Sequence, residues 1–335
     1  MKVLRRISIS ALLTCSVLMV TFPSAYAGDK LRLAATTHSD HVYTQTAYKF
    51  AEAVAAKTNG EVEIKVYPAR QLGNEREQME AVTMGSIAFS LPPVGLLGNI
   101  SPVWSGLQMP FIYNNTLVAT HAYRLPIIER MKDKLKEKGL IGVVIGDCGL
   151  RPYVLRKGPV NTIEDIQGLK IRALQSPITI DSIKALGASP TPLPFGEIYT
   201  ALQQGVIDGS DMDLDAIRLQ KFYEVAKYYT KAGYIGFPFL IIMNKAKFDN
   251  YPTKIQKAIL EAGDEATEYN MNRILEFERN AGEILRGFGC EYNEIKDLPE
   301  WQKREEWVYD KYSKQEPLIA EFLEEVKKLN QQYGQ

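Results

Sequence analysis

Residues 168–209 read GLKIRALQSPITIDSIKALGASPTPLPFGEIYTALQQGVIDG, and the stretch alternates between strand-like and helix-like patterns. Leu169–Ala173 has the apolar alternation of a strand, and a second, short strand is expected at Val206–Asp208. Ile178–Leu186 and Ile198–Gln204 have helical periodicity, and each is ended by a glycine. Strand–helix units of this kind build a sheet with helices on both faces, so the stretch predicts an α/β fold.

The same alternation extends toward the N-terminus. Strands are expected at Leu31–Thr36 and Val62–Val66, with a helix at Tyr43–Thr58 between them. Leu140–Ile145 is a continuous apolar run, which is typical of a central parallel strand. The chain has 335 residues. A single hydrophobic core rarely serves a chain of this length, so we expect two lobes.

The first 27 residues have the pattern of a signal peptide. Lys2, Arg5 and Arg6 precede an uncharged apolar stretch, and Ala25-Tyr26-Ala27 offers the small residues that a signal peptidase reads. The apolar stretch is shorter than the roughly 20 residues of a membrane span. We therefore expect export to the periplasm, and cleavage after Ala27.

The predicted boundaries follow from this order of elements. Residues 1–27 are the signal peptide, residues 28–149 plus 238–276 form lobe I, and residues 150–237 plus 277–335 form lobe II.

Composition and motifs argue against several function classes. Lys plus Arg and Asp plus Glu number 40 each, and no basic block predicts binding to nucleic acid or to a lipid surface. The common catalytic and nucleotide-binding motifs are absent, so we expect no enzyme and no cofactor. His38 and His41 form a His-x-x-His pair without a third ligand, so no metal site is expected. Cys148 and Cys290 lie in apolar settings and are predicted to be buried free thiols.

Several motifs occur together along the mature chain. They are GLKIR at 168–172, PFGEIYTALQQGVIDG at 194–209, QKFYEV at 220–225, and YP followed by QLG and ERE between 67 and 77. In combination they resemble the solute receptors of tripartite ATP-independent periplasmic (TRAP) transporters, the DctP family. This resemblance implies the two-lobed periplasmic-binding-protein fold, with the ligand enclosed between the lobes.

The resemblance also implies site residues in the second lobe. Arg172, the arginine of GLKIR, is expected to grip the ligand carboxylate, and its planar fork suits two parallel hydrogen bonds. Arg151 corresponds to a second arginine that lines the cleft, with a hinge-anchoring ion pair as the alternative. Phe195 corresponds to an aromatic residue that packs on the ligand, with a core position as the alternative.

One position departs from the family pattern. Many members have an asparagine that bonds the ligand where this chain has Met212, between Asp211 and Asp213. An apolar side chain here favours a ligand with an apolar or aromatic body, such as an aromatic 2-oxo acid or an amino acid. Either aspartate could pair an ammonium group on the ligand, or could cap a helix instead.

Further pocket residues are predicted from their places at strand ends and helix starts, where open α/β sheets bind ligands. These residues are Thr36, His38, Glu75 and Pro93. Phe237 is predicted separately, because it lies where the chain crosses again between the lobes and could form a wall of the pocket.

The expected function is capture of a small organic acid and its delivery to the small and large TRAP membrane subunits. The protein is expected to act as a monomer and to close about its hinge. A binding protein that serves a sensor kinase or an ATP-driven importer is one alternative. An enzyme on a similar scaffold is another.

Overall fold

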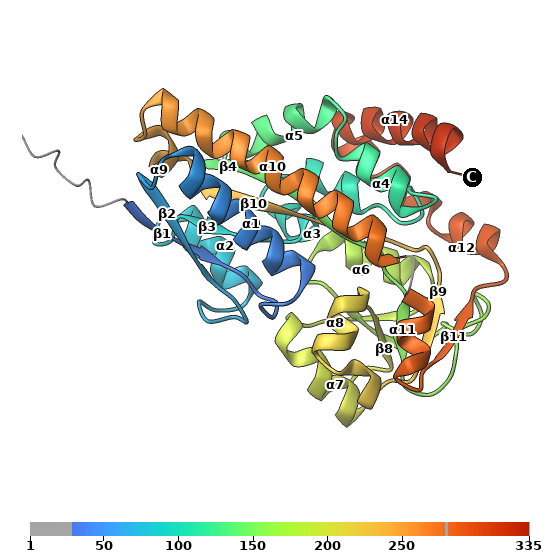
Figure 1. The fold of residues 1–335 in the computed structure, drawn as a ribbon. Helices are drawn as coiled ribbons and strands as arrows, with labels where there is room; N and C mark the ends of the chain where they lie inside the picture. Colours follow the sequence, from blue (N-terminus) through green and yellow to red (C-terminus); the bar gives the residue numbers. More distant parts are fainter. Residues whose placement is uncertain (1–28, 279–280, 335) are drawn as a thin grey trace, which may run out of the picture.

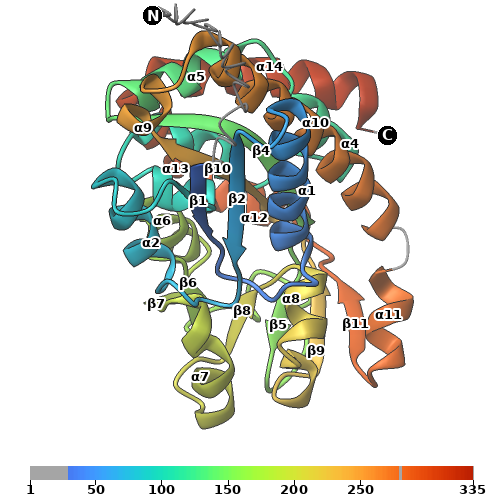
Figure 2. The same cartoon turned by 60° about the vertical axis from the view of Figure 1, so that its left-hand side comes forward.

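The computed structural model describes residues 29–278 and 281–334. It shows two lobes, each built on its own sheet (Figures 1 and 2). The predicted signal peptide, residues 1–27, lies outside the described residues.

The sheet of the first lobe has five strands in the order β2-β1-β3-β10-β4. β1 pairs in parallel with β2 and β3, and β10 runs antiparallel to β3 and β4. The strands are β1 (Asp29–Ala34), β2 (Val62–Tyr67), β3 (Phe89–Ser90), β4 (Leu140–Leu150) and β10 (Gly236–Asn244).

Helices cover both faces of this sheet, and apolar side chains form a core on each side. One face carries α1 (Val42–Lys57), α9 (Lys245–Asp249) and α10 (Thr253–Glu278). The other face carries α2 (Glu75–Thr83), α3 (Val94–Leu97), η1 (Pro102–Gln108), α4 (Thr116–Ala122) and α5 (Ile127–Lys136).

The apolar run at residues 140–145 was expected in the centre of a parallel sheet, and this expectation is wrong. β4 is an edge strand that pairs only with β10, and the pairing is antiparallel. The strand is buried because α5 and α10 pack on its two sides. A continuous apolar run reports burial on both faces, and helices can supply that burial at the edge of a sheet.

The second lobe has six strands in the order β11-β9-β5-β8-β6-β7. β5 runs antiparallel to β8 and β9, whereas the other pairs are parallel. The strands are β5 (Tyr153–Leu155), β6 (Lys170–Ala173), β7 (Ser189–Pro192), β8 (Gly209–Asp211), β9 (Tyr228–Lys231) and β11 (Glu291–Glu294).

Short helices surround this second sheet. They are α6 (Pro177–Ala185), η2 (Phe195–Glu197), α7 (Ile198–Gln204), α8 (Leu214–Leu219), η3 (Phe222–Glu224), α11 (Ala281–Gly287) and α12 (Leu298–Arg304). Cys148 and Cys290 are both buried and unpaired with each other, as predicted.

Two strands cross between the lobes side by side. β4 leads into β5 and β9 leads into β10, and their ends are joined where Arg151 N donates to Ile235 O at 3.1 Å. Asp147 fixes this crossing, because its Oδ1 accepts hydrogen bonds from the backbone N–H groups of Cys148 and Phe237. The two sheets and their crossing strands form the two-lobed fold that the sequence predicted.

The predicted boundaries placed the C-terminal residues 277–335 in lobe II. β11 and Trp301 lie in the second lobe as expected. However, α13 (Glu306–Gln315) and α14 (Pro317–Tyr333) insert Tyr312 and Phe322 into the core of the first lobe. Figure 1 shows α14 beside α4. An amphipathic helix packs wherever an apolar face needs cover, so we propose that residues 306–333 belong to lobe I.

Candidate ligand-binding site

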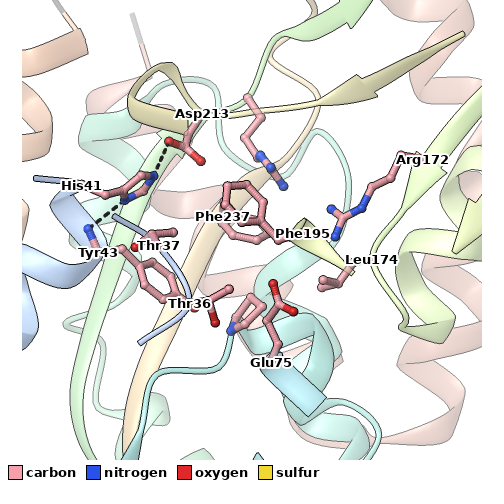
Figure 3. Close-up of a pocket in the computed structure, with 12 residues that line it drawn as sticks. Thr36, Thr37, His41, Tyr43, Glu75, Arg172, Leu174, Phe195, Asp213 and Phe237 are labelled. Carbon is pink, nitrogen blue, oxygen red and sulfur yellow. Dashed lines mark hydrogen bonds and ion pairs between the residues drawn. The ribbon is translucent and has the colours of Figure 1, made fainter. Parts of the chain in front are cut away.

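A small cavity lies between the two lobes, and side chains from both line it (Figure 3). Its volume is about 30 Å³, which is room for about two water molecules. Eight predicted residues line it: Thr36, Glu75, Pro93, Arg151, Arg172, Phe195, Asp213 and Phe237. The fold therefore brings these side chains to one place, and their contact with a ligand stays a prediction.

Arg172 lies near the end of β6 and is the most unusual group in the cavity. Its side chain is 2% exposed, and its Nε donates to Leu193 O at 3.0 Å. Among the described residues it has no ion-pair partner within 4.0 Å. Burial, with a further contribution from the charge of Arg151, lowers the pKa of Arg172 to about 10. The guanidinium keeps its charge at neutral pH and is available to an anion.

Arg151, in contrast, is engaged on several sides. Its Nη1 lies 3.1 Å from Asp211 Oδ2, its Nη2 donates to Met212 Sδ at 3.3 Å, and its guanidinium lies 3.9 Å from the ring centroid of Phe237. These contacts agree with the alternative for Arg151, a hinge-anchoring ion pair.

Three predicted residues do not line the cavity. Met212 is fully buried in the core of the second lobe, and Asp211 is the partner of Arg151. Met212 directly follows β8, and its side chain packs among the apolar residues of that core and not at the cavity. The side chain of His38 is 49% exposed and contacts its neighbours Ser39 and Asp40.

Four cavity residues were missed: Thr37, His41, Tyr43 and Leu174. Period-two alternation from Arg172 in β6 was a signal that could have found Leu174. The sequence predicted His41 to be part of a polar loop at the mouth of the cleft, and did not single it out as a cavity residue. In the structure, His41 is the N-cap of α1, where its Nδ1 accepts a hydrogen bond from Tyr43 N at 3.1 Å.

Asp213 joins two functions in one carboxylate. It caps α8 by accepting from Ala216 N at 2.9 Å, as one of the two alternatives for this residue predicted. The same oxygen lies 2.9 Å from His41 Nε2 across the cleft (Figure 3). Burial raises the pKa of Asp213, but His41, Arg151 and the cap outweigh it and leave the pKa below its usual value. The carboxylate is therefore charged at neutral pH.

The first lobe contributes oxygen atoms to the cavity. Glu75 is the first residue of α2 and is buried, and Figure 3 shows its carboxylate directed into the space beside Arg172. The Thr36 hydroxyl is buried and has no partner among the described residues. Tyr43 donates its hydroxyl hydrogen to Leu91 O at 2.6 Å, and burial raises its pKa, so the phenol is neutral.

Within residues 29–278 and 281–334, no group of three metal-ligating side chains gathers at one place. Over the same residues, no helix is long and apolar enough to cross a membrane.

Comparison with known proteins agrees with this architecture. A family model described as "bacterial extracellular solute-binding protein, family 7" matches residues 33–315. The chain is 30% identical over 271 residues to the 2,3-diketo-L-gulonate-binding periplasmic protein YiaO of Escherichia coli strain K12, which covers 80% of this chain and 82% of that protein.

Solved structures resemble the chain over nearly its whole length. A TRAP periplasmic solute-binding protein from Chromohalobacter salexigens with bound D-glucuronate has 27% identity and a TM-score of 0.84, covering 89% of this chain and 99% of that one. One from Desulfovibrio salexigens with bound orotic acid has 28% identity and a TM-score of 0.84, covering 90% and 99%.

Proposed function

The chain belongs to the bacterial extracellular solute-binding proteins of family 7, the DctP family, and on this premise we propose that it captures a small monocarboxylate in the periplasm. The captured acid passes to the small and large membrane subunits of a TRAP transporter. The protein itself acts as a monomer and catalyses no reaction. A role with a sensor kinase or an ATP-driven importer has no observation in its favour.

The observation that supports this proposal is the unpaired charge of Arg172. A buried guanidinium is costly unless an anion pairs with it. Arg172 presents its fork to a cavity between the lobes and has no ion pair among the described residues. A ligand carboxylate would accept two parallel hydrogen bonds there and remove the cost of burial.

The other charges of the cavity argue for one carboxylate rather than two. Arg151 is already neutralised by Asp211. Glu75 and Asp213 add two further carboxylates to the walls. A second carboxylate on the ligand would face these groups without a free cation, and like charges in a buried site repel strongly.

The body of the ligand should therefore carry hydroxyl or other donor groups. Glu75, Asp213 and the Thr36 hydroxyl offer acceptors around the cavity. Sugar acids have this combination of one carboxylate and several hydroxyls. The 2,3-diketo-L-gulonate-binding relative and the similar structure with bound D-glucuronate support this class of ligand.

Two phenylalanines support a second candidate, a carboxylate with a planar or aromatic body. Phe195 and Phe237 both line the cavity, and aromatic walls favour a flat ligand. The sequence-based preference for such a ligand, an aromatic 2-oxo acid or an amino acid, also relied on Met212, which lies outside the cavity. A sugar acid is therefore the first candidate ligand, and a planar or aromatic acid is the second.

Closure about the crossing strands is the proposed mechanism. The cavity is too small for such an acid in the present arrangement, so the lobes or the lining side chains must move apart for entry. Contacts from the ligand to both lobes then stabilise the closed form.

A thermal-shift and calorimetry panel tests the proposal. It compares D-glucuronate, orotate, phenylpyruvate, succinate and neutral D-glucose on the purified mature chain. We expect binding by monocarboxylates and none by glucose, because glucose leaves Arg172 unpaired. Binding of glucose with no response to any carboxylate would contradict the proposal.

A matched variant tests the charge argument. Glu75→Gln keeps the shape of the side chain and removes one negative charge from the cavity. Succinate should gain affinity in this variant relative to D-glucuronate. Equal changes for both acids would contradict a role of Glu75 in excluding dicarboxylates.

A further inference from the structure

The two lobes touch through a buried set of polar contacts at one rim of the cleft. His41 Nε2 lies 2.9 Å from Asp213 Oδ1, and Val42 N donates to Asp215 Oδ2 at 2.9 Å. His41 and Val42 begin α1 in the first lobe, whereas Asp213 and Asp215 begin α8 in the second. All four residues are buried.

The hydrogen bonds define the tautomer of His41. Its Nδ1 accepts from Tyr43 N at 3.1 Å, so this nitrogen carries no proton. In the neutral ring the proton is then on Nε2, which donates to the Asp213 carboxylate. The ring thus caps its own helix with one nitrogen and binds the other lobe with the second.

Each aspartate is also held within its own lobe. Asp213 Oδ1 accepts from Ala216 N, and Asp215 Oδ1 accepts from Arg218 Nη2 at 3.0 Å. The acceptors are therefore oriented before the lobes meet. A hydrogen bond to an acceptor that is already oriented is more favourable than one to a mobile acceptor, because less side-chain entropy is lost when the bond forms.

The opposite rim is built differently. There a hydrogen bond between the lobes, from Asn99 Nδ2 to Gln175 O at 3.1 Å, is exposed, and Leu174 and Ile178 of the second lobe add buried apolar contact with the first. Water competes well for an exposed contact and poorly for a buried one. The buried polar contacts of the first rim therefore resist competition from water better than this exposed hydrogen bond does.

We propose that His41, Val42, Asp213 and Asp215 form an interlobe clasp that sets the population of the closed form, and thereby raises the affinity for every ligand by the same factor. Asp215 and Val42 do not line the cavity, so they act on closure and not on ligand choice. Apparent affinity scales with the fraction of molecules that can close. The effect on affinity rests on the proposed function; the effect on closure does not.

Asp215→Ala is the decisive variant, because it removes an acceptor outside the cavity. We expect the apparent Kd for D-glucuronate, orotate and phenylpyruvate to rise by a common factor of about ten, with their rank order unchanged. Without added acid, the Asp215→Ala variant should have a larger radius of gyration in small-angle X-ray scattering than the wild-type chain has. Unchanged scattering, or a factor that differs strongly among the acids, would overturn the proposal.

Further variants guard against a folding defect. Asp165→Ala removes a carboxylate that accepts from the backbone of Asn161 and Thr162 within one lobe, and it should change neither affinity nor scattering. His41→Ser keeps a cap for α1 but cannot reach Asp213, so it should open the lobes like Asp215→Ala. If the wild-type chain binds none of the acids, the proposed function fails, while the scattering comparison still tests the clasp.

Discussion

Arg151 and Arg172 are two buried arginines on the wall of one cavity, yet their surroundings differ. Arg151 is held by Asp211, Met212 and the face of Phe237. Arg172 has one hydrogen bond, to a backbone carbonyl, and no ion pair among the described residues. The same side chain thus fixes the structure in one place and leaves a charge available in the other.

The difference has an energetic reason. The free-energy cost of removing a guanidinium from water is offset when a carboxylate and an aromatic face take the place of the water, as they do for Arg151. For Arg172 the cost of burial is not offset within the chain, and its lowered pKa reflects this. Sites that bind ligands often retain such local instability, because function and stability place different demands on the same residue.

The strongest test of the comparison removes the partner of Arg151. Asp211→Ala leaves a buried guanidinium without its carboxylate, so the free energy of unfolding should fall by about 3–5 kcal/mol. Urea denaturation without ligand measures the loss. Glu294→Ala is the control, because its pair with Lys231 is exposed and should contribute no more than about 1 kcal/mol. Equal losses in both variants would mean that burial does not determine how much an ion pair contributes to the free energy of unfolding.

Removal of Arg172 should give the opposite pattern. In Arg172→Ala, ligand binding should weaken by about 2–5 kcal/mol, whereas the free energy of unfolding without ligand should not fall. Arg172→Lys should also bind poorly, since an ammonium lacks the planar fork. Calorimetry and denaturation on the same samples check both parts. A large loss of stability with unchanged affinity would make Arg172 a structural residue like Arg151.

Glu305 extends the comparison of paired and unpaired buried groups, because it is a buried ionisable side chain that lies outside the cavity. Both of its carboxyl oxygens lack a partner among the described residues. Burial, with a smaller contribution from Asp181, raises its pKa well above the usual value. The folded chain thus holds a proton that the unfolded chain releases, and the free energy of unfolding falls as the pH rises above about 4, where the unfolded glutamate ionises.

Glu305→Gln should therefore raise the free energy of unfolding at pH 8 by on the order of 1–3 kcal/mol. The gain should shrink toward about pH 3, where the carboxyl group is protonated in both the folded and the unfolded state. Denaturation curves between these pH values measure the slope, and ligand affinity should stay unchanged. A gain independent of pH would show that Glu305 does not titrate in this range.

The smallest expected effect concerns the ring beneath Arg151. Phe237→Leu removes the face on which the guanidinium lies and should cost about 1 kcal/mol of stability. The ion pair with Asp211 remains, so the loss should be well below that of Asp211→Ala. Denaturation of both variants under the same conditions shows which loses more stability. A larger loss in Phe237→Leu would mean that the ring, and not the ion pair, holds Arg151 in place.

Much of the site follows from local sequence. Strand ends and helix starts gave Thr36, Glu75 and Pro93, and a motif gave Arg172 and Phe195, all of which line the cavity. Met212 and His38 do not line the cavity, because the direction of a side chain depends on strand register and on the turn that precedes a helix. His41 was missed as a cavity residue because its partner, Asp213, is 172 residues away.

The sequence by itself determined the α/β class, the two lobes and the family, because periodicity, glycine stops and motifs are local properties of the chain. Only the tertiary structure decided which arginine is paired, and that side chains of α13 and α14 pack in the core of the first lobe. Pairing and packing depend on distances between residues far apart in the chain, and no local pattern encodes those distances. The unpaired charge of Arg172 is a property of this kind, because it depends on the fold bringing no carboxylate within ion-pair distance among the described residues.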